Sequence, residues 1–306
     1  MTYRLFVMDR AYSSWSLRGW MMFEPFGLSC AVTQANWPSP EWEALLARVA
    51  PARTVPALEI GEGPETFHVW DSLAIAETLA ERHPEAGHWP AEPAARAAAR
   101  ALAAEMHSGF SALRSACPMN LKAVYSSYEP SEAVLADVAR IRALWAWARG
   151  RFGGAGPFLF GERFTAADAF YLPVASRFAS FGLPRGPEDD AYIEALHRVP
   201  AFRRWRAMAV VNPHVVEEDV ADLPVTGAFG PGEAPLPARA VEGSAPVNEA
   251  CPYSGKPVSP DSLAKIDGVV IGYCNRFCRD KSVADALAWP ATAAILAAEG
   301  RGRPAA

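Results

Sequence analysis

The sequence predicts an α/β domain, followed by an all-α domain and a small cysteine-rich module. Strand-like and helix-like segments alternate over residues 1–85, whereas residues 90–220 carry only helical patterns. Three of the five cysteines lie in residues 249–292, after a Pro- and Gly-rich stretch at 221–248 whose composition is typical of a linker. These four ranges are the domain boundaries that we expect.

The composition narrows the possible classes of protein. Of the 306 residues, 51% are hydrophobic, which excludes general disorder and supports more than one filled core. The net charge of −5 gives no overall attraction to nucleic acid or to an anionic membrane. Five cysteines are too few for a disulfide scaffold, and we expect neither a secretory nor a membrane-spanning segment. We expect a cytoplasmic protein with reduced thiols.

The first domain alternates short runs of two kinds. Their order, β-α-β-α-β-β-α, predicts a small sheet covered by helices, the thioredoxin-like arrangement. The expected strands are Tyr3–Met8, Cys30–Ala35, Pro56–Ile60 and Phe67–Trp70, and the expected helices are Trp15–Phe26, Pro40–Val49 and Ser72–Arg82.

The second domain reads as helix throughout. Apolar residues recur at helical spacing over Ala91–Leu113 and Glu132–Phe152. Thr165 and Asp168 have the spacing of a capping box at the start of a further helix, a role in folding rather than in catalysis.

Ser13 and Ser14 lie between the first strand and the first helix, and they are the candidate catalytic residues. Free N–H groups and the helix dipole favour a negative charge at such a position, so a thiol held there ionises more readily. The alternative is that one of these serines only caps the helix.

Two further pairs precede regular elements. A cis bond before Pro56 would expose the backbone of Val55 for pairing with an extended peptide, although a proline is also ordinary in a loop. Ser72 offers a hydroxyl and an amide to a carboxylate at a helix N-terminus, and Asp71 could accept hydrogen bonds from an ammonium group. An N-cap is the alternative role here as well.

Taken together, this arrangement resembles a glutathione S-transferase over about residues 1–220. The run Ser13-Ser14-Trp15-Ser16-Leu17-Arg18 is most similar to the Ser-Ser-Cys-x-x-Arg motif of the zeta class. Trp15 stands where that class has cysteine, so the cysteine-dependent isomerisation of the class is not implied. Activation of a thiol by a serine is compatible with the motif.

The resemblance implies a role for each candidate residue. A hydroxyl of Ser13 or Ser14 would donate to the sulfur of glutathione, the co-substrate, for attack on a small hydrophobic electrophile. Val55, Pro56, Asp71 and Ser72 would bind glutathione. His107 and Arg114 would line the electrophile pocket, or else serve helix packing or a dimer interface. The family further implies a homodimeric detoxification enzyme.

The C-terminal module is built around Cys251, Cys274 and Cys278. Their spacing, Cys-x22-Cys-x3-Cys, places two sulfurs on one helical turn and the third in a Cys-Pro-x-x-Gly turn. Thiolates favour zinc or copper(I), and a segment this short gains stability from a metal. The module resembles TRASH and YHS-type metal-binding modules. The alternative is three reduced cysteines in a small core without metal.

Two other functions fit the same chain. One is a non-catalytic protein of this fold that binds glutathione or a partner and senses metal or redox state through the C-terminal module. The other is a glutathione-dependent reductase or peroxidase, which would favour a cysteine at Ser13 or Ser14.

Overall fold

The computed structural model describes residues 2–229 and 236–302, and these form two compact units. The first comprises the chain up to Val199 together with His214–Phe229. The second comprises Pro200–Pro213 and the described residues from 236 onward. Among the described residues, no helix combines the length and hydropathy that crossing a lipid bilayer requires.

The first unit begins with a four-stranded sheet in the order β2-β1-β3-β4. Strand β1 runs parallel to β2 and antiparallel to β3, and the edge strand β4 is antiparallel to β3. The strands are β1 (Tyr3–Val7), β2 (Ala31–Gln34), β3 (Ala57–Ile60) and β4 (Phe67–Trp70). The predicted thioredoxin-like domain is confirmed.

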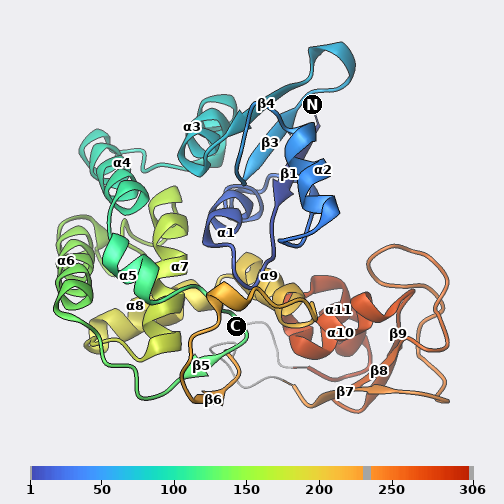
Figure 1. Cartoon of the computed structure of the whole chain (residues 1–306). Coiled ribbons are helices and arrows are strands. Elements are labelled where there is room, and N and C mark those ends of the chain that lie inside the picture. Colours follow the sequence, from blue (N-terminus) through green and yellow to red (C-terminus); the bar gives the residue numbers. More distant parts are fainter. Residues whose placement is uncertain (1, 230–235, 303–306) are drawn as a thin grey trace. The chain divides into compact units, whose positions relative to one another are not determined.

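Helices cover both faces of this sheet (Figure 1). Helices α1 (Ser14–Trp20) and α3 (Ser72–Arg82) lie on one face and contact each other. Helix α2 (Pro40–Arg48) covers the other face, where Phe6 of β1 joins a buried cluster with Trp42 and Leu45. Side chains along β1 can contact both layers of helices, because successive residues of a strand point to opposite faces of the sheet.

Helix α1 is shorter than the sequence pattern predicts. It ends at Trp20 instead of continuing to Phe26. A separate turn of 3-10 helix follows, in which Pro25 has no N–H to offer and Gly27 ends the turn with a positive φ of 71°.

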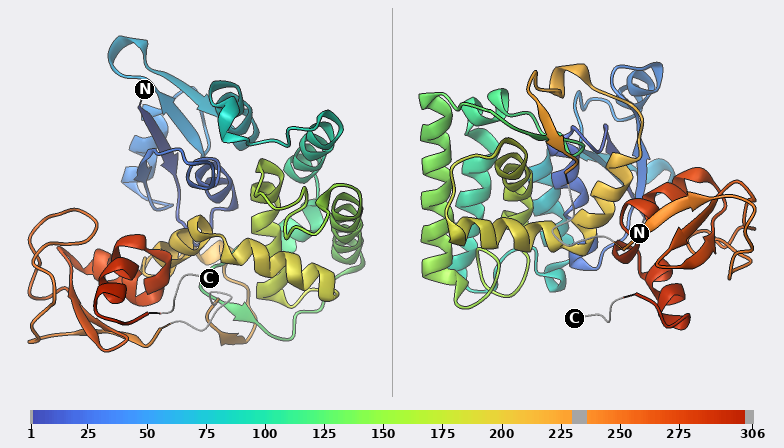
Figure 2. Two further views of the ribbon diagram at one scale, coloured as in Figure 1. Left: turned by 180° about the vertical axis from the view of Figure 1, so that it is seen from behind. Right: turned by 90° about the horizontal axis from the view of Figure 1, so that it is seen from below.

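The helical part of the first unit is arranged around α7. Almost every residue of α7 is buried, and α7 contacts α1, α4 and α8 (Figure 2). The predicted capping box starts this helix, where Asp168 accepts hydrogen bonds from the backbone N–H and the hydroxyl of Thr165. The helices of this part are α4 (Pro93–Ser108), α5 (Ser111–Ala116), α6 (Glu132–Ala148), α7 (Ala166–Phe181) and α8 (Pro187–Arg198).

The predicted helix Ala91–Leu113 is interrupted at Gly109. Gly109 is extended, and a Cβ there would lie 2.7 Å from the carbonyl oxygen of Glu105. Phe110 then takes a left-handed conformation with φ 56°, and α5 starts in a new direction. This break brings Arg114 of α5 to the site described below.

The second unit pairs a three-stranded antiparallel sheet, ordered β7-β8-β9, with three helices. Helix α10 contacts β7, β8 and α9, and Arg203 of α9 makes two hydrogen bonds to the buried carboxylate of Asp285. The elements are α9 (Pro200–Val210), β7 (Ala238–Val241), β8 (Leu263–Ile266), β9 (Val269–Gly272), α10 (Arg276–Ala284) and α11 (Pro290–Ala298). Helix α9, which we expected to belong to the second domain, therefore groups with the cysteine module.

The stretch 221–248, expected to be a linker, contains regular structure. Strand β6 (Val225–Gly227) pairs with β5 (Val124–Tyr125) in the first unit, and β7 is an edge strand of the second unit's sheet. Residues 230–235 lie outside the described part. Short turns of 3-10 or π helix complete the list: Glu24–Phe26, Gly63–Glu65, Pro84–Ala86, Arg149–Gly153, Glu217–Asp219 and Ala286–Ala288.

Candidate functional site

Ser13 is the N-cap of α1. Its Oγ accepts a hydrogen bond from the backbone N–H of Ser16 (3.2 Å) and donates one to the Ser16 hydroxyl (2.8 Å). The Ser16 hydroxyl in turn accepts from the N–H of Met8 at 3.0 Å. The capping role proposed for one of the two serines therefore belongs to Ser13.

Ser14, the first residue of α1, has a different environment. Its Oγ lies 3.5 Å from a guanidinium nitrogen of Arg177, which also donates to the carbonyl oxygens of Cys117 and Pro173. Burial and the charge of Arg114 lower the pKa of Arg177 to about 10. Arg177 therefore stays protonated at neutral pH, and its positive charge lies next to the Ser14 hydroxyl.

Trp15 occupies the position of the cysteine in the zeta-class motif. Its ring lies between two guanidinium groups, with Arg18 at 4.6 Å and Arg114 at 4.7 Å from the ring centroid. Arg18 is completely buried and donates to the carbonyl oxygen of Phe170. These are cation–π contacts, which hold Trp15 in place.

The turn before β3 approaches α1 closely. The Val55–Pro56 peptide bond is cis, one of the two possibilities that the sequence left open. A Cβ on Gly19 would lie only 2.7 Å from the Cβ of Pro56, so the absence of a side chain at Gly19 allows this packing.

Asp71 and Ser72 begin α3. Asp71 has a positive φ of 77° and caps the helix by accepting from the N–H of Leu73 at 2.8 Å. Its other carboxylate oxygen lies 3.1 Å from Nε2 of His107. The hydroxyl of Ser72 is buried and has no hydrogen-bond partner among the described residues.

Several of these residues line one cavity of about 520 Å³. It brings together the predicted residues Ser13, Ser14, Val55 and Arg114, whereas Pro56, Asp71, Ser72 and His107 are not among its lining residues. The remaining lining residues are Met8, Tyr12, Trp15, Trp42, Thr54, Ser111, Ser115, Pro118, Met119, Arg177 and Asp219. His107, expected to line the electrophile pocket or to serve helix packing or a dimer interface, pairs with Asp71 and packs edge-on against Trp15.

Sequence reasoning missed two charged residues of this cavity. Arg177 lies within the buried helix α7, and Asp219 lies in the segment after α9. Neither belongs to a local motif; the only signal for Arg177 was an arginine in an otherwise apolar helix. A larger cavity of about 1100 Å³, near Trp89 and Phe160, contains no predicted site residue.

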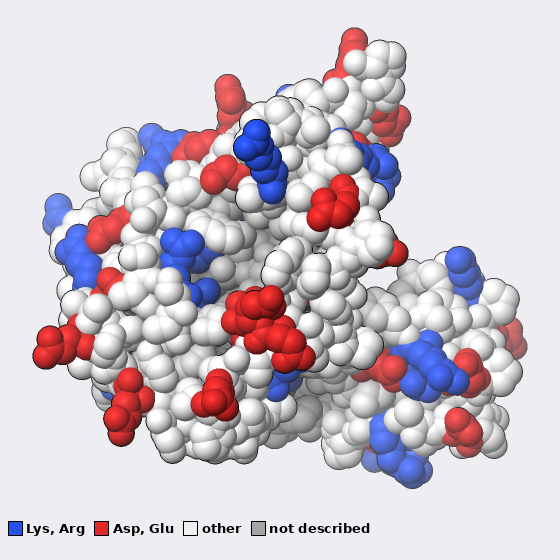
Figure 3. All heavy atoms as spheres, in the orientation of Figure 1, with Lys and Arg blue, Asp and Glu red and all other residues white. Residues whose placement is uncertain are grey.

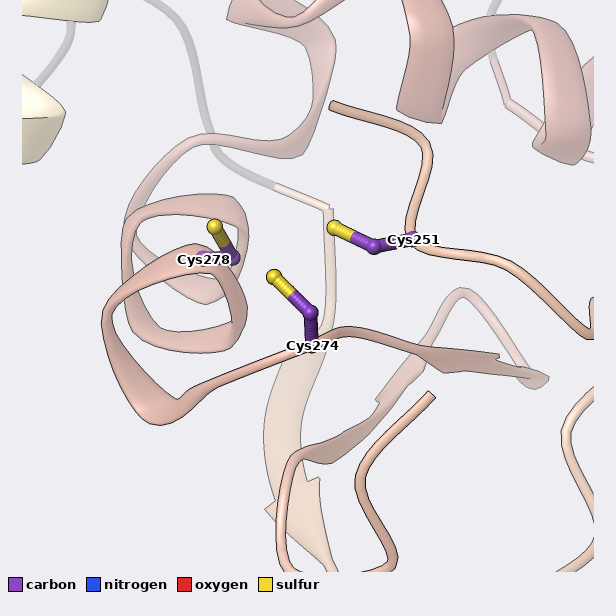
Figure 4. Close-up of side chains that lie close together, drawn as sticks. All are labelled: Cys251, Cys274 and Cys278. Carbon is purple, nitrogen blue, oxygen red and sulfur yellow. The ribbon is translucent and has the colours of Figure 1, made fainter. Parts of the chain in front are cut away.

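The three cysteines of the second unit form a cluster. Their sulfur atoms all lie within 4.8 Å of one another and gather in one place (Figure 4). Cys251 lies in a turn closed by a hydrogen bond from its N–H to Lys256, Cys274 follows β9, and Cys278 lies in the first turns of α10.

Two cysteines of this cluster differ in their tendency to ionise: hydrogen bonds to sulfur outweigh burial and lower the pKa of Cys251 to about 7, whereas burial raises the pKa of Cys278 to about 12. Burial raises the pKa of Cys251, but hydrogen bonds from the backbone of Tyr253 and Cys274 and from Ser254 lower it by a larger amount. The net pKa of Cys251 therefore lies below that of a free thiol. Ser254 and Asn275 donate to Cys274 Sγ at 3.2 and 3.3 Å. Three sulfurs at this separation fit around one ion at a metal–sulfur distance of about 2.3 Å.

The comparisons with known proteins agree with the described geometry. The family model "Glutathione S-transferase, N-terminal domain" matches residues 12–82, and "Glutathione S-transferase, C-terminal domain" matches 93–207. Together the two matches span more than half of the chain. No curated protein matches the sequence closely enough to count as a relative.

Solved structures of similar fold include three from different organisms. A maleylacetoacetate isomerase from Anaeromyxobacter dehalogenans, with bound dicarboxyethyl glutathione and citrate, is 25% identical, with a TM-score of 0.51 over 72% of this chain and 97% of that one. A Tau class glutathione S-transferase from mango is 17% identical, with a TM-score of 0.52 over 71% of this chain and 96% of that one. Glutathione transferase Omega 1C from Trametes versicolor is also 17% identical, with a TM-score of 0.52 over 68% of this chain and 93% of that one.

The thioredoxin-like sheet, the helical domain arranged around α7 and the two matched family models lead to one conclusion. The chain belongs to the glutathione S-transferase family.

Proposed function

We propose that this protein is a glutathione transferase in which a serine hydroxyl stabilises the glutathione thiolate for attack on a small electrophile. The observation that carries the proposal is the shared cavity of Ser13, Ser14, Val55 and Arg177. A thiolate there would lie at the N-terminus of α1 and near a guanidinium group, and both favour the ionised form.

Glutathione has groups that match the surrounding residues. The backbone of Val55 can pair with the extended cysteinyl backbone of glutathione. The buried, unpartnered hydroxyl of Ser72 at the start of α3 suits the γ-glutamyl carboxylate, and Asp71 suits the γ-glutamyl ammonium group.

The hydrogen bonds favour Ser14 as the donor to sulfur. The hydroxyl proton of Ser13 is already used in its bond to Ser16, whereas the Ser14 oxygen accepts from Arg177 and keeps its own proton for a ligand. Ser13 would have to release Ser16 before it could donate.

In the reaction, the glutathione sulfur attacks an electrophilic carbon and a C–S bond forms. With an aryl halide, the carbon–halogen bond breaks, the halide leaves with the electron pair, and the thiol proton passes to solvent. Trp15, Trp42 and Met119 provide apolar surface for the electrophile.

The test has two stages: retention on a glutathione-affinity column, then turnover of a generic aryl halide. Retention with turnover supports the transferase. Retention without turnover favours the alternative, a glutathione-binding protein without catalysis. A protein that shows neither retention nor turnover would contradict both the transferase and the glutathione-binding protein.

We also propose that the protein is a homodimer. Phe67 and Trp70 on the edge strand β4 are each 43% exposed, and Trp147 of α6 is 50% exposed. Exposed aromatic side chains on an edge strand are suited to an interface. Light scattering coupled to size exclusion measures the mass, and replacement of Trp70 by Glu should give monomers.

For the second unit, we propose that Cys251, Cys274 and Cys278 bind a thiophilic metal, zinc or copper(I). The supporting observation is the convergence of three sulfur atoms from separate elements. Protein purified without chelator should carry about one metal ion per chain by elemental analysis. Cys278→Ser should lose it; metal-free wild-type protein would contradict the proposal.

A further inference from the structure

Asp219 brings a negative charge to the cavity of the proposed active site. It belongs to the turn Glu217–Asp219, which follows α9 and lies beyond residue 207, where the match to the family models ends. Acidic side chains gather over this turn in the middle of the face shown in Figure 3, beside a hollow. Asp219 lines the cavity together with Arg114 and Arg177.

The segment that carries Asp219 is held on both sides. Before it, Lys122 donates to the carbonyl oxygen of His214 at 2.6 Å, and Val216 is buried. After it, the N–H of Ala221 donates to the hydroxyl of Tyr125 at 3.3 Å, and β6 pairs with β5. Contacts on both sides therefore fix Asp219 in the wall of the cavity.

The charges of the cavity can be counted. Arg114 and Arg177 contribute two positive charges and Asp219 contributes one negative charge. The other lining residues carry no charge. The glutathione thiolate of the proposed function adds a second negative charge. A neutral electrophile then leaves the cavity balanced, whereas a carboxylate on the electrophile would add an uncompensated negative charge in a partly buried site.

We propose that Asp219 determines the electrophile specificity of this site, so that it accepts uncharged electrophiles and disfavours those that carry a carboxylate. This inference rests on the proposed function.

The test uses two preformed nitrophenyl conjugates of glutathione, one with a carboxamide and one with a carboxylate para to sulfur. Titration calorimetry measures the affinity of each, so the result does not depend on turnover. In both conjugates the sulfur is an uncharged thioether, so the comparison isolates the interaction of Asp219 with the added carboxylate. Asp219→Asn should raise the affinity for the carboxylate conjugate relative to the carboxamide conjugate about tenfold, the effect of removing one like charge from a partly buried site.

Glu218→Gln is the matched control, because it removes a neighbouring exposed carboxylate that does not line the cavity. It should keep the wild-type ratio. Asp219→Ser, a second variant of the same position, should reproduce the shift seen with Asn, which guards against a folding defect in one variant.

Two outcomes would overturn the inference in distinguishable ways. If both conjugates bind and Asp219→Asn changes the ratio no more than Glu218→Gln, specificity does not depend on Asp219, and the proposed function stands. If the wild-type protein binds neither conjugate nor glutathione, the proposed function fails, and the inference fails with it.

Discussion

Nε2 of His107 in α4 lies 3.1 Å from a carboxylate oxygen of Asp71, the residue that caps α3. The helical domain thus contacts the residue that we assign to the γ-glutamyl end of glutathione. This contact and the bond from Leu73 N–H orient the Asp71 carboxylate although its side chain is 46% exposed.

Asp71→Asn should weaken glutathione binding about tenfold, because asparagine retains an acceptor for the cap but loses the charge that attracts an ammonium group. Calorimetric titration with glutathione measures this. Glu77→Gln, on the exposed side of the same helix, is the control and should bind like wild type. Unchanged affinity in Asp71→Asn would remove Asp71 from the glutathione site.

Ser14→Ala should raise the pKa of bound glutathione and lower kcat/KM by about a hundredfold, which is the scale of losing one positioned hydrogen-bond donor. Ultraviolet absorbance of the thiolate against pH measures the pKa directly. Ser13→Ala should instead lower the free energy of unfolding by about 1 kcal/mol through loss of the α1 cap. The reverse pattern would assign thiol activation to Ser13.

The specificity set by Asp219 should depend on pH. Burial raises the pKa of Asp219 to about 6, although Arg177 lowers it, while Glu218 on the same turn and Asp9 in the β1–α1 loop raise it further. Tyr12, which also faces this group, has a pKa raised to about 12 by burial and stays neutral.

As the pH falls below about 6, Asp219 becomes neutral and the charge of Arg177 is no longer balanced. Affinity for the carboxylate conjugate relative to the carboxamide should therefore rise as the pH falls from 7 to 5. Asp219→Asn should show a flat ratio over the same range. A wild-type ratio that does not change with pH would contradict this reading.

Arg203→Met should destabilise the second unit by about 3 kcal/mol, because it leaves the buried carboxylate of Asp285 without its two hydrogen bonds from the guanidinium group. Chemical denaturation of the full chain, followed by tryptophan fluorescence, measures the loss. Arg301→Met, at an exposed position beyond the end of α11, should have little effect. Equal stability of the two variants would show that α9 is not integral to this unit.

Lys281 of α10 acts electrostatically on the cysteine cluster. Its Nζ lies 3.9 Å from the ring centroid of Trp289 and 4.0 Å from that of Tyr253. Burial raises the pKa of Cys278 to about 12, and the charge of Lys281 opposes this rise. Lys281→Met should weaken metal binding about tenfold, as one nearby positive charge is removed. Competition with a chelator measures the affinity, and exposed Lys265→Met is the matched control.

The sequence by itself determined the elements and their order. The apolar runs of β1 to β4 and the helix starts at Ser72 and Thr165 could all be predicted, because each depends on residues close together in the chain. The same holds for the serine pair and the three cysteines, which form local motifs or a recognisable spacing.

The tertiary structure alone decided how the cavity is completed. Arg177 and Asp219 come from α7 and from a turn after α9, far from the serine motif in the chain, and only packing brings them to Ser14. His107 is a polar residue of the kind expected in a pocket, but it lies on α4 beside Asp71. The chain changes direction at Gly109, and Arg114 on α5 lines the cavity. The charge balance of the site, and with it the proposed choice of electrophile, follows from these long-range contacts, which no local pattern encodes.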